Sequence, residues 1–296
     1  MNRLNYEKVF KTLVEETGNY LVNHSLRAMV LGVSGGIDST VVAAICCEVN
    51  KQTNIPLIGR SLPIKNKKDE FDVSKLVGEA FCNNFDVANL YDEYKCFLSG
   101  LVWREERIDL LDDTETMHPE KSKQQTLIAN GNIQARLRMI YLYNLASIHN
   151  GLVMSTDNQT EYQLGFWTIH GDVGDFDPIQ DLWKTEVYQL AEWLKLFYYT
   201  DGDKAVAIGE SIKLTPTDGL GISNSDLDQI GAKSYNDVDR VLQTLVCPAS
   251  PENDRVQDAL TVEIGPEIID KIIKRRSNSR FKREKSPIYI SRERYE

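Results

Sequence analysis

The sequence predicts an α/β fold in which helices cover both faces of a doubly wound parallel sheet. Short apolar runs alternate with amphipathic segments along the chain, which is typical of strand and helix repeats. Residues 28–33 form a nearly continuous apolar run, the pattern of a strand buried on both faces of a parallel sheet. The chain has 296 residues, of which 42% are hydrophobic, so it is long enough for one large domain or two small ones.

The expected elements of the first half follow in order. A helix over residues 6–23 precedes the first strand, and a loop separates that strand from a helix over 40–49. The next strand, helix and strand are expected at 55–62, 70–81 and 85–90. Residues 103–125 are polar and acid-rich without a clear period. We expect a solvated surface loop there, with a substrate lid as the alternative.

The second half begins with a long helix over residues 132–149. It carries a stripe of apolar residues at helical spacing, which predicts one core-facing side: Ile133, Leu137, Ile140, Tyr141, Leu145 and Ile148. A fourth strand over 152–154 and a helix over 182–196 follow. Ligands of such sheets lie at the carboxyl ends of strands, beside the point where strand order reverses. Thr156, just after the fourth strand, and Ser34, just after the first, are therefore expected to share one crevice.

The loop after the first strand reads SGGIDS over residues 34–39 and predicts a phosphate site. Gly35 and Gly36 lack a Cβ, so the backbone can take positive φ values and approach a ligand. Ser34 and Ser39 add hydroxyl groups, and the first turn of the following helix favours an anion. The alternative interpretation is an ordinary turn, capped by serine and aspartate, without a ligand.

Asp38 is the exceptional member of this loop. A carboxylate in a phosphate pocket repels the ligand unless a divalent cation lies between them, so we interpret Asp38 as a magnesium ligand. The spacing is neither that of the Walker loop, G-x-x-x-x-G-K-[ST], nor that of the dinucleotide fingerprint, G-x-G-x-x-G. The loop therefore predicts a different class of phosphate-binding protein.

Composition excludes several other classes. A formal charge of −10 argues against nucleic acid as the main partner, because phosphate backbones are bound by clustered lysines and arginines. No apolar run approaches the ~20 residues of a membrane span, and the N-terminus has no apolar signal core. The five cysteines form no C-x-x-C pair, so we expect reduced, mostly core thiols in a cytoplasmic protein without membrane partners.

Several blocks of the chain, taken together, resemble ammonia-dependent NAD synthetase. The SGGIDS loop is similar to that of the ATP pyrophosphatase (adenine nucleotide alpha-hydrolase) superfamily. The further blocks occur in the order and spacing of the family and lie at 131–139, 155–161, 165–172, 178–185, 216–220, 234–239 and 282–287. The resemblance implies a single adenine nucleotide alpha-hydrolase-like domain over 1–296, with an insertion at 103–125 and a substrate-covering tail at 277–296.

The resemblance also implies an activity and the residues that perform it. In the family, ATP adenylates the nicotinate carboxylate of deamido-NAD with release of pyrophosphate, and ammonia then displaces AMP. The matching catalytic residues are Asp38, Glu161 and Lys184, of which Asp38 and Glu161 are the magnesium ligands. The matching ATP contacts are Ser34, Gly35, Gly36, Ile37, Asp38, Ser39, Thr156, Lys184 and Thr217. The matching deamido-NAD contacts are Arg136, Asp175 and Lys282.

Three of these assignments have a structural alternative. Glu161 is also suited to stabilise a helix dipole, Lys184 to be a solvated helix residue, and Lys282 to belong to a solvated basic run. Arg136 and Arg138 stand two residues apart and point to different faces of a helix, so we expect one of them at a surface or interface. The physical case for the site is that magnesium and Lys184 neutralise charge when one anion attacks another.

The resemblance further implies a homodimer, formed through the helices near Arg136. Met139, Tyr141, Leu142 and Tyr143 supply more apolar surface than one core-facing stripe requires, which suits a partner helix, with deeper burial as the alternative. The nitrogen donor is expected to be free ammonia or ammonia from a separate protein. The blocks leave no room for a glutamine-hydrolysing domain, and residue 2 is asparagine rather than a nucleophilic cysteine.

Two departures from the family lie in the acceptor pocket. Ile169 stands where the family usually has a lysine, and Phe281 where it has a histidine. These changes keep nicotinate mononucleotide open as an alternative substrate for the same amidation. A tRNA-modifying enzyme and a non-catalytic nucleotide-binding relative are more distant alternatives.

Overall fold

The chain forms a four-stranded parallel sheet in the computed structural model, which describes residues 4–109, 119–217, 225–246 and 259–284. The strands, in the spatial order β3-β2-β1-β4, are β1 (Ala28–Gly32), β2 (Leu57–Ser61), β3 (Asn84–Val87) and β4 (Gly151–Val153). In register, Met29 lies beside Leu57 on one side and beside Leu152 on the other. The order reverses between β1 and β4, so the predicted doubly wound α/β fold is confirmed.

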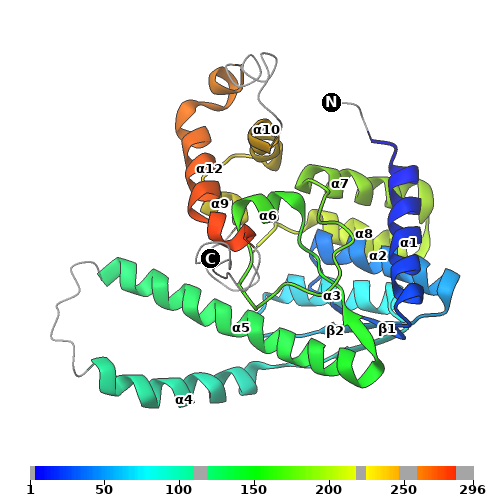
Figure 1. Ribbon diagram of the computed structural model, residues 1–296, viewed down its shortest axis with the longest axis horizontal. Helices are drawn as coiled ribbons and strands as arrows, with labels where there is room; N and C mark the ends of the chain where they lie inside the picture. Colours follow the sequence, from blue (N-terminus) through cyan, green and yellow to red (C-terminus); the bar gives the residue numbers. More distant parts are fainter. Residues whose placement is uncertain (1–3, 110–118, 218–224, 247–258, 285–296) are drawn as a thin grey trace, which may run out of the picture.

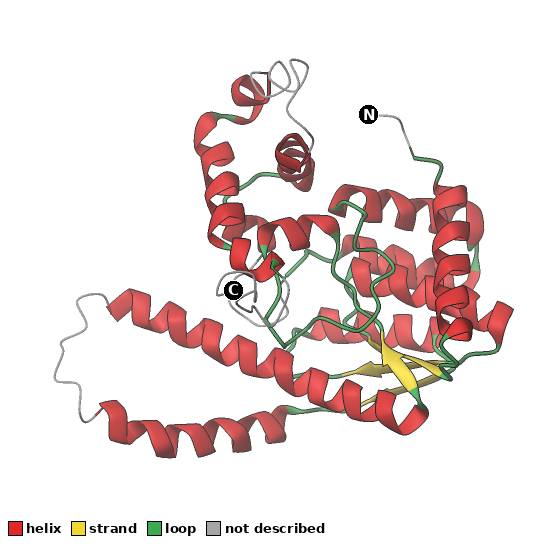
Figure 2. Ribbon diagram, viewed as in Figure 1, coloured by secondary structure: helices red, strands yellow, loops and turns green. Residues whose placement is uncertain are grey.

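Two hydrophobic layers bury the sheet. Alternate side chains of β1 point to opposite faces: Met29 and Leu31 join one core cluster, while Ala28 and Val30 join the other. Helices α1 (Tyr6–Asn23), α2 (Ile37–Thr53) and α3 (Lys68–Phe81) cover the first face, and α5 covers the second (Figures 1 and 2). The prediction of a first strand buried on both faces is therefore confirmed.

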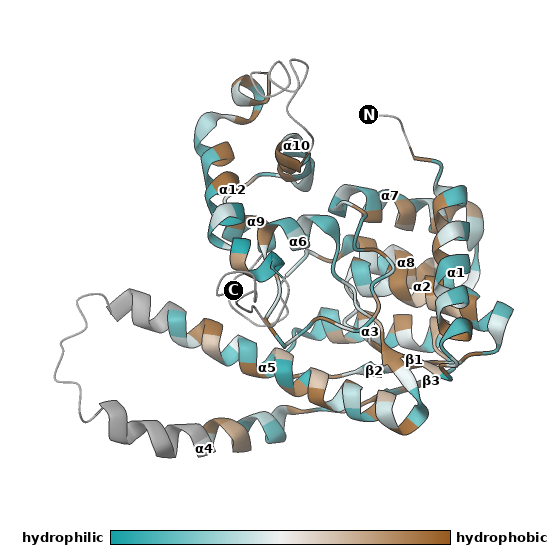
Figure 3. Ribbon diagram, viewed as in Figure 1, coloured by the Kyte–Doolittle hydropathy of each residue, from teal (hydrophilic) through white to brown (hydrophobic). Residues whose placement is uncertain are grey.

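Helix α2 is apolar around most of its circumference because other helices surround it. Its buried residues run almost without interruption from Ile37 to Val49, and Figure 3 shows the apolar colouring along it. Its neighbours include α7 (Lys184–Trp193), a π-helical turn at Leu194–Tyr198 and α8 (Gly202–Lys213). A helix that is hydrophobic all round belongs in a core, and α2 fits this rule.

The region predicted as a surface loop, residues 103–125, is largely helical. Helix α4 (Tyr91–Asp109) and helix α5 (Pro119–His149) lie side by side and extend away from the sheet (Figure 2), while residues 110–118 lie outside the described ranges. The loop expectation was wrong because this part of the pair projects beyond the sheet, where a helix needs no apolar stripe. Proline at the first position of α5 is favourable for a helix start.

The core-facing side of α5 also differs from the expected stripe. Met139, Leu142 and Ala146 are its buried residues against the sheet, whereas Ile140 and Ile148 are 66% and 68% exposed. Four expected members, Ile133, Leu137, Tyr141 and Leu145, are partly buried and pack against the same cluster. The predicted stripe is therefore correct for these four residues and wrong for Ile140 and Ile148.

A group of C-terminal helices forms a third hydrophobic cluster beside α6 (Gln159–Leu164). It contains α9 (Asp226–Ile230), α10 (Tyr235–Val246), a helical stretch at 259–264 and α12 (Pro266–Asn278), which is followed by a 3-10 turn at Arg280–Arg283. Val238, Leu242 and Ile272 are completely buried within the cluster. The expectation that 1–296 is a single domain stays a prediction.

The predictions about membrane-spanning segments and about the burial of the cysteines have separate outcomes. Among the described residues there is no helix with the length and apolarity needed to cross a membrane. Cys46 and Cys47 are buried free thiols, but Cys82 is half-buried and Cys96 is exposed. The expectation of core cysteines therefore holds for the adjacent pair in α2 and fails for Cys96, while Cys247 lies outside the described ranges.

We expect Glu48→Ala to lower the free energy of unfolding by about 1–3 kcal/mol, because the buried Tyr199 hydroxyl loses its acceptor. The Glu48 carboxylate accepts hydrogen bonds from Tyr199 at 2.5 Å and Tyr198 at 3.0 Å, and Lys51 Nζ lies 2.7 Å away. Burial acts to raise the pKa of Glu48, but these hydrogen bonds outweigh it and hold the pKa below its ordinary value.

Urea unfolding of both proteins tests the expectation, with the exposed Glu15→Ala as the control. A lowered folded-state pKa means that the stabilisation is complete above the unfolded-state pKa and is lost as the pH falls through the folded-state pKa. The difference between wild type and Glu48→Ala should therefore shrink on acidification. A difference below 0.5 kcal/mol at neutral pH, within the range of ordinary surface substitutions, contradicts the role.

Candidate active site

A cavity opens at the carboxyl ends of β1 and β4, where the strand order reverses. Its lining includes Ser34 from the loop after β1 and Thr156 from the segment after β4. The prediction that these two residues share one crevice is confirmed. Glu161, Lys184 and Thr217 also line the cavity, so segments far apart in the sequence meet there.

The loop at 34–39 is held by its own hydroxyl groups. The Ser34 and Ser39 hydroxyl oxygens are 2.9 Å apart, and the Gly36 N–H donates to Ser34 Oγ at 3.2 Å. Gly36 is the N-cap of α2 and makes no side-chain cap hydrogen bond. The start of this helix faces the cavity, and phosphate binding by the loop stays a prediction.

The two glycines of the loop have different roles. Gly35 has a φ of +85°, and a Cβ on it would lie 2.7 Å from the backbone nitrogen of Ser74 and 2.8 Å from the carbonyl oxygen of Glu70. Gly35 is thus required for close packing of the loop against α3, and Gly36 rather than Gly35 lines the cavity. Gly35 has the predicted positive φ, and its contact with a ligand stays a prediction.

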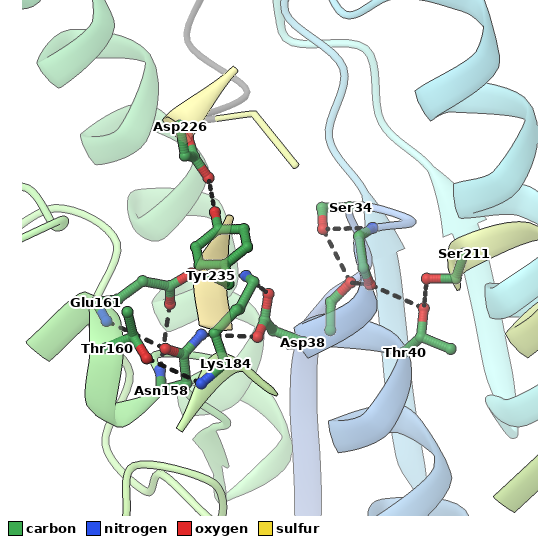
Figure 4. Close-up of polar contacts among 12 residues, drawn as sticks. Ser34, Asp38, Thr40, Asn158, Thr160, Glu161, Lys184, Ser211, Asp226 and Tyr235 are labelled. Carbon is green, nitrogen blue, oxygen red and sulfur yellow. Dashed lines mark hydrogen bonds and ion pairs between the residues drawn. The ribbon is translucent and has the colours of Figure 1, made fainter. Parts of the chain in front are cut away.

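Lys184 lies between the two carboxylates that were predicted to bind magnesium. Its Nζ is 2.5 Å from Asp38 Oδ2 and 2.9 Å from Glu161 Oε1 (Figure 4). Lys184 is the first residue of α7 and is only 2% exposed. The interpretation of Lys184 as a solvated helix residue is therefore wrong, and the three predicted catalytic residues form one ion-paired cluster.

Asn158 connects these two carboxylates and was missed by the sequence reasoning. Its Nδ2 donates to Asp38 Oδ1 at 2.8 Å, and its backbone N–H donates to Glu161 Oε2 at 3.2 Å. Its Oδ1 accepts the Glu161 N–H at 3.1 Å, which makes Asn158 and Glu161 a capping box at the start of α6. The N-x-x-E spacing at 158–161 was the signal that could have identified it.

The electrostatics of the cavity are dominated by buried carboxylates. Burial raises the pKa of Glu161 to about 8, against the lowering effect of Lys184, and Asp38 raises it further. Burial also raises the pKa of Asp172, which lines the same cavity. Burial would lower the pKa of Lys184, but Asp38 and Glu161 outweigh it and hold that pKa well above its ordinary value. The site therefore holds one firmly protonated lysine among several acids.

Asp38 and Glu161 have the chemistry of a magnesium site but are bridged by a lysine. All four of their carboxylate oxygens accept a protein hydrogen bond. Within the described ranges, no group of three or more His, Cys, Asp or Glu side chains could hold a metal ion. Mg²⁺ often uses only one or two protein carboxylates together with substrate phosphates, so the pair fits this ion once Lys184 turns to another anion.

The three residues assigned to deamido-NAD do not line this cavity. Arg136 is exposed and donates to Ile169 O at 3.1 Å, while Asp175 accepts the Val153 N–H at 3.1 Å. Lys282 lines a second cavity, where its Nζ donates to the Gly165 carbonyl oxygen at 2.7 Å. Their role in acceptor binding stays a prediction.

Arg138 and Asp172 line the main cavity instead. Arg138 donates to Leu62 O at 3.0 Å and to Asn66 Oδ1 at 3.1 Å, and burial lowers its pKa to about 10. Asp172 Oδ1 accepts the Thr168 N–H at 2.7 Å. Of the two arginines on α5, the structure thus places Arg138 at the cavity and Arg136 at the surface.

Comparison with known proteins gives matches to NAD synthases, both from a family model and from individual relatives. The family model described as NAD synthase matches residues 9–286. A Wolinella succinogenes protein named NH(3)-dependent NAD(+) synthetase is 30% identical over 291 residues, covering 97% of each chain.

Two solved structures share the fold. NMN synthetase from Francisella tularensis superposes with a TM-score of 0.73 at 23% identity, covering 98% of this chain and 100% of that one. NH3-dependent NAD synthetase from Campylobacter jejuni superposes with a TM-score of 0.67 at 21% identity, covering 97% and 100%.

Proposed function

The chain belongs to the NAD synthase family, and we propose that it makes NAD by ATP-dependent amidation of deamido-NAD with ammonia. One observation carries the proposal: the SGGIDS loop, Glu161 and Lys184 meet in one cavity at the switch point of the sheet. Thr156 and Thr217, the other predicted ATP contacts, line the same cavity. The family makes the protein a ligase that forms a carbon–nitrogen bond.

The proposed reaction has two steps. In the first, a carboxylate oxygen of the nicotinate forms a bond to the α-phosphorus of ATP, and the bond between that phosphorus and the bridging oxygen to the β-phosphorus breaks, so pyrophosphate leaves. In the second, the ammonia nitrogen bonds to the acyl carbon, AMP leaves with the electron pair of the carbon–oxygen bond, and a proton is released. The overall products are amide, AMP and pyrophosphate.

Lys184 and the start of α2 are suited to the first step. The departing pyrophosphate gains negative charge, and preorganised donors in a site that excludes water stabilise such charge strongly. The open first turn of α2 offers backbone N–H groups to phosphate. Lys184, released from Asp38 and Glu161, would offer its ammonium group to the phosphate oxygens, whose negative charge would replace that of the two carboxylates.

We further propose that Asp38 and Glu161 hold Mg²⁺ when ATP is bound. The triphosphate would bring further negative charge into a cavity that is already lined by Asp38, Glu161 and Asp172, and a divalent cation offsets this repulsion. Asp38 and Glu161 would hold the ion, and Lys184 would then be available to pair with phosphate. The ion supplies charge neutralisation, while the chain positions the two reacting groups.

For the acceptor, we keep Arg136, Asp175 and Lys282 as proposed contacts in a homodimer. The support is the outward face of α5, where Ile140, Ile148 and Tyr143 are exposed. Met139 and Leu142 do not contribute to this face, because they are buried against the sheet.

Ammonia, free or delivered by another protein, is the proposed nitrogen donor. We place the reaction in the cytoplasm, which suits the free thiols of α2.

Nicotinate mononucleotide is the second candidate substrate. Phe281, at the position of the family histidine, is 53% exposed and lines the second cavity. Ile169 offers Arg136 only its backbone oxygen. These two departures remove polar contacts to the acceptor and favour a substrate without the adenylyl half.

Incubation with ATP, magnesium, ammonium and each acid separately tests the proposal. We expect equal amounts of AMP, pyrophosphate and amide with deamido-NAD, and a kcat/KM for nicotinate mononucleotide at least tenfold lower. A reversed preference favours the second candidate. Formation of ADP and orthophosphate contradicts the adenylation mechanism, and ATP binding without pyrophosphate release identifies a non-catalytic relative.

A further inference from the structure

Helix α10 reaches the active site through a carboxylate that does not line the cavity. Asp239, in the middle of α10, is 2% exposed and belongs to the C-terminal group of helices. Its Oδ1 accepts a hydrogen bond from Thr160 Oγ1 at 2.5 Å, and its Oδ2 accepts the Thr185 N–H at 2.9 Å. One side chain therefore connects the first turns of α6 and α7.

Thr160 completes a closed network at this point. Its Oγ1 donates to Asp239 and accepts the backbone N–H of Lys184 at 2.9 Å. The residues adjacent in sequence are the catalytic ones, since Thr160 precedes Glu161 and Thr185 follows Lys184. Any shift between α6 and α7 would thus change the distance of 2.9 Å between Lys184 Nζ and Glu161 Oε1.

The charge of Asp239 is also suited to this position. The N-cap of α7 is Trp183, which makes no side-chain cap hydrogen bond with the helix start. Asp239 supplies an anionic acceptor from another helix, where the helix dipole favours negative charge. One turn earlier on α10, Tyr235 lies with its ring centroid 5.5 Å from Lys184 Nζ, and its hydroxyl donates to Asp226 Oδ2 at 3.1 Å (Figure 4).

We propose that Asp239 is a positioning residue for adenylation, which holds Lys184 and Glu161 in register by joining α6 to α7. The inference rests on the proposed function, because it assigns the C-terminal helices a part in the adenylation machinery in addition to any role in covering substrate. Asp239 contacts neither the cavity nor the reacting groups. It acts through the backbones of the two helices that carry the catalytic side chains.

The test compares Asp239→Asn with a matched control, Asp237→Asn, on the same helix. Asparagine keeps the shape but loses the charge and one acceptor, so the Thr185 N–H or the Thr160 hydroxyl loses its partner. We expect kcat to fall about 10- to 100-fold, which is the size of effect seen when a hydrogen-bond partner that orients a functional side chain is removed. We expect calorimetry to give one bound nucleotide per chain, with Kd within threefold of wild type. Asp237→Asn should match wild type.

Thr160 variants provide the conservative rescue. Thr160→Val should lower kcat as Asp239→Asn does, and Thr160→Ser should keep most of the rate. The double variant of Asp239→Asn with Thr160→Val should be much less than additive, because both remove one network. The number of nucleotides bound per chain could instead fall by the same factor as kcat. That result would show that Asp239 only maintains the fold, and it would overturn the proposal.

Labelling of Lys184 tests the same inference without any turnover. The rate of amine acetylation, followed by peptide mass spectrometry, should rise at least tenfold for Lys184 in Asp239→Asn, while the exposed Lys11 reacts as in wild type. If wild type turns over none of the tested acids, the proposed function fails and this labelling result still decides the role of Asp239. Wild-type labelling of Lys184 together with wild-type kcat would overturn it.

Discussion

Lys184→Met is expected to lower turnover strongly and to make the stability of the protein depend on magnesium. Without the lysine, Asp38 and Glu161 face each other without their shared cation, and removal of one partner from a buried ion pair costs about 3–5 kcal/mol. Loss of the charge opposite the leaving pyrophosphate should lower kcat about 10²- to 10³-fold. The same change removes the cation that competes with Mg²⁺ for the two carboxylates.

Thermal unfolding of Lys184→Met, measured with increasing Mg²⁺ in the absence of ATP, tests the second effect. The variant should gain more stability from the metal than wild type does, because a ligand that binds only the folded state stabilises it by mass action. Lys11→Met is the matched control, since Lys11 pairs with Glu7 at 2.6 Å on the exposed surface. Equal magnesium responses in Lys184→Met and wild type would contradict a metal site at these carboxylates.

Asp38→Asn is expected to stop pyrophosphate release while the protein stays folded. The asparagine has nearly the same shape, but its amide NH2 replaces one of the two oxygens that accept from Lys184 Nζ and Asn158 Nδ2, and it cannot accept from either donor. A neutral amide is also a poor ligand for Mg²⁺ compared with a carboxylate. We therefore expect the rate of pyrophosphate release to fall by about 10³-fold.

Initial rates of pyrophosphate release with saturating ATP and acid provide the measurement. Asp203→Asn is the matched control, because Asp203 also lies in the first turn of a helix, α8, and is exposed. Circular dichroism and urea unfolding should show that Asp38→Asn is folded under the assay conditions. Turnover within threefold of wild type would remove Asp38 from the metal site and from catalysis.

The sequence alone predicted the α/β architecture and the sheet edge where Ser34 and Thr156 lie. The apolar run at 28–33 was consistent with a strand buried on both faces, because period-two alternation was absent and the run was short. The parallel topology then placed the ends of β1 and β4 at one edge, so Ser34 and Thr156 had to meet. These conclusions follow from the hydrophobic periodicity of each segment and from the alternation of strand and helix segments, both of which are visible in the sequence.

The partners of individual side chains depended on the tertiary structure. Lys184 and Asp38 are separated by 146 residues, and Thr160 and Asp239 by 79, so no local pattern relates them. Helix α5 carries apolar residues on two faces, and only packing against β1 and β4 decided that Met139 faces inward and Ile140 outward. Propensity and periodicity describe one element at a time, whereas ion pairs and buried faces are set by the surfaces that different elements bring together.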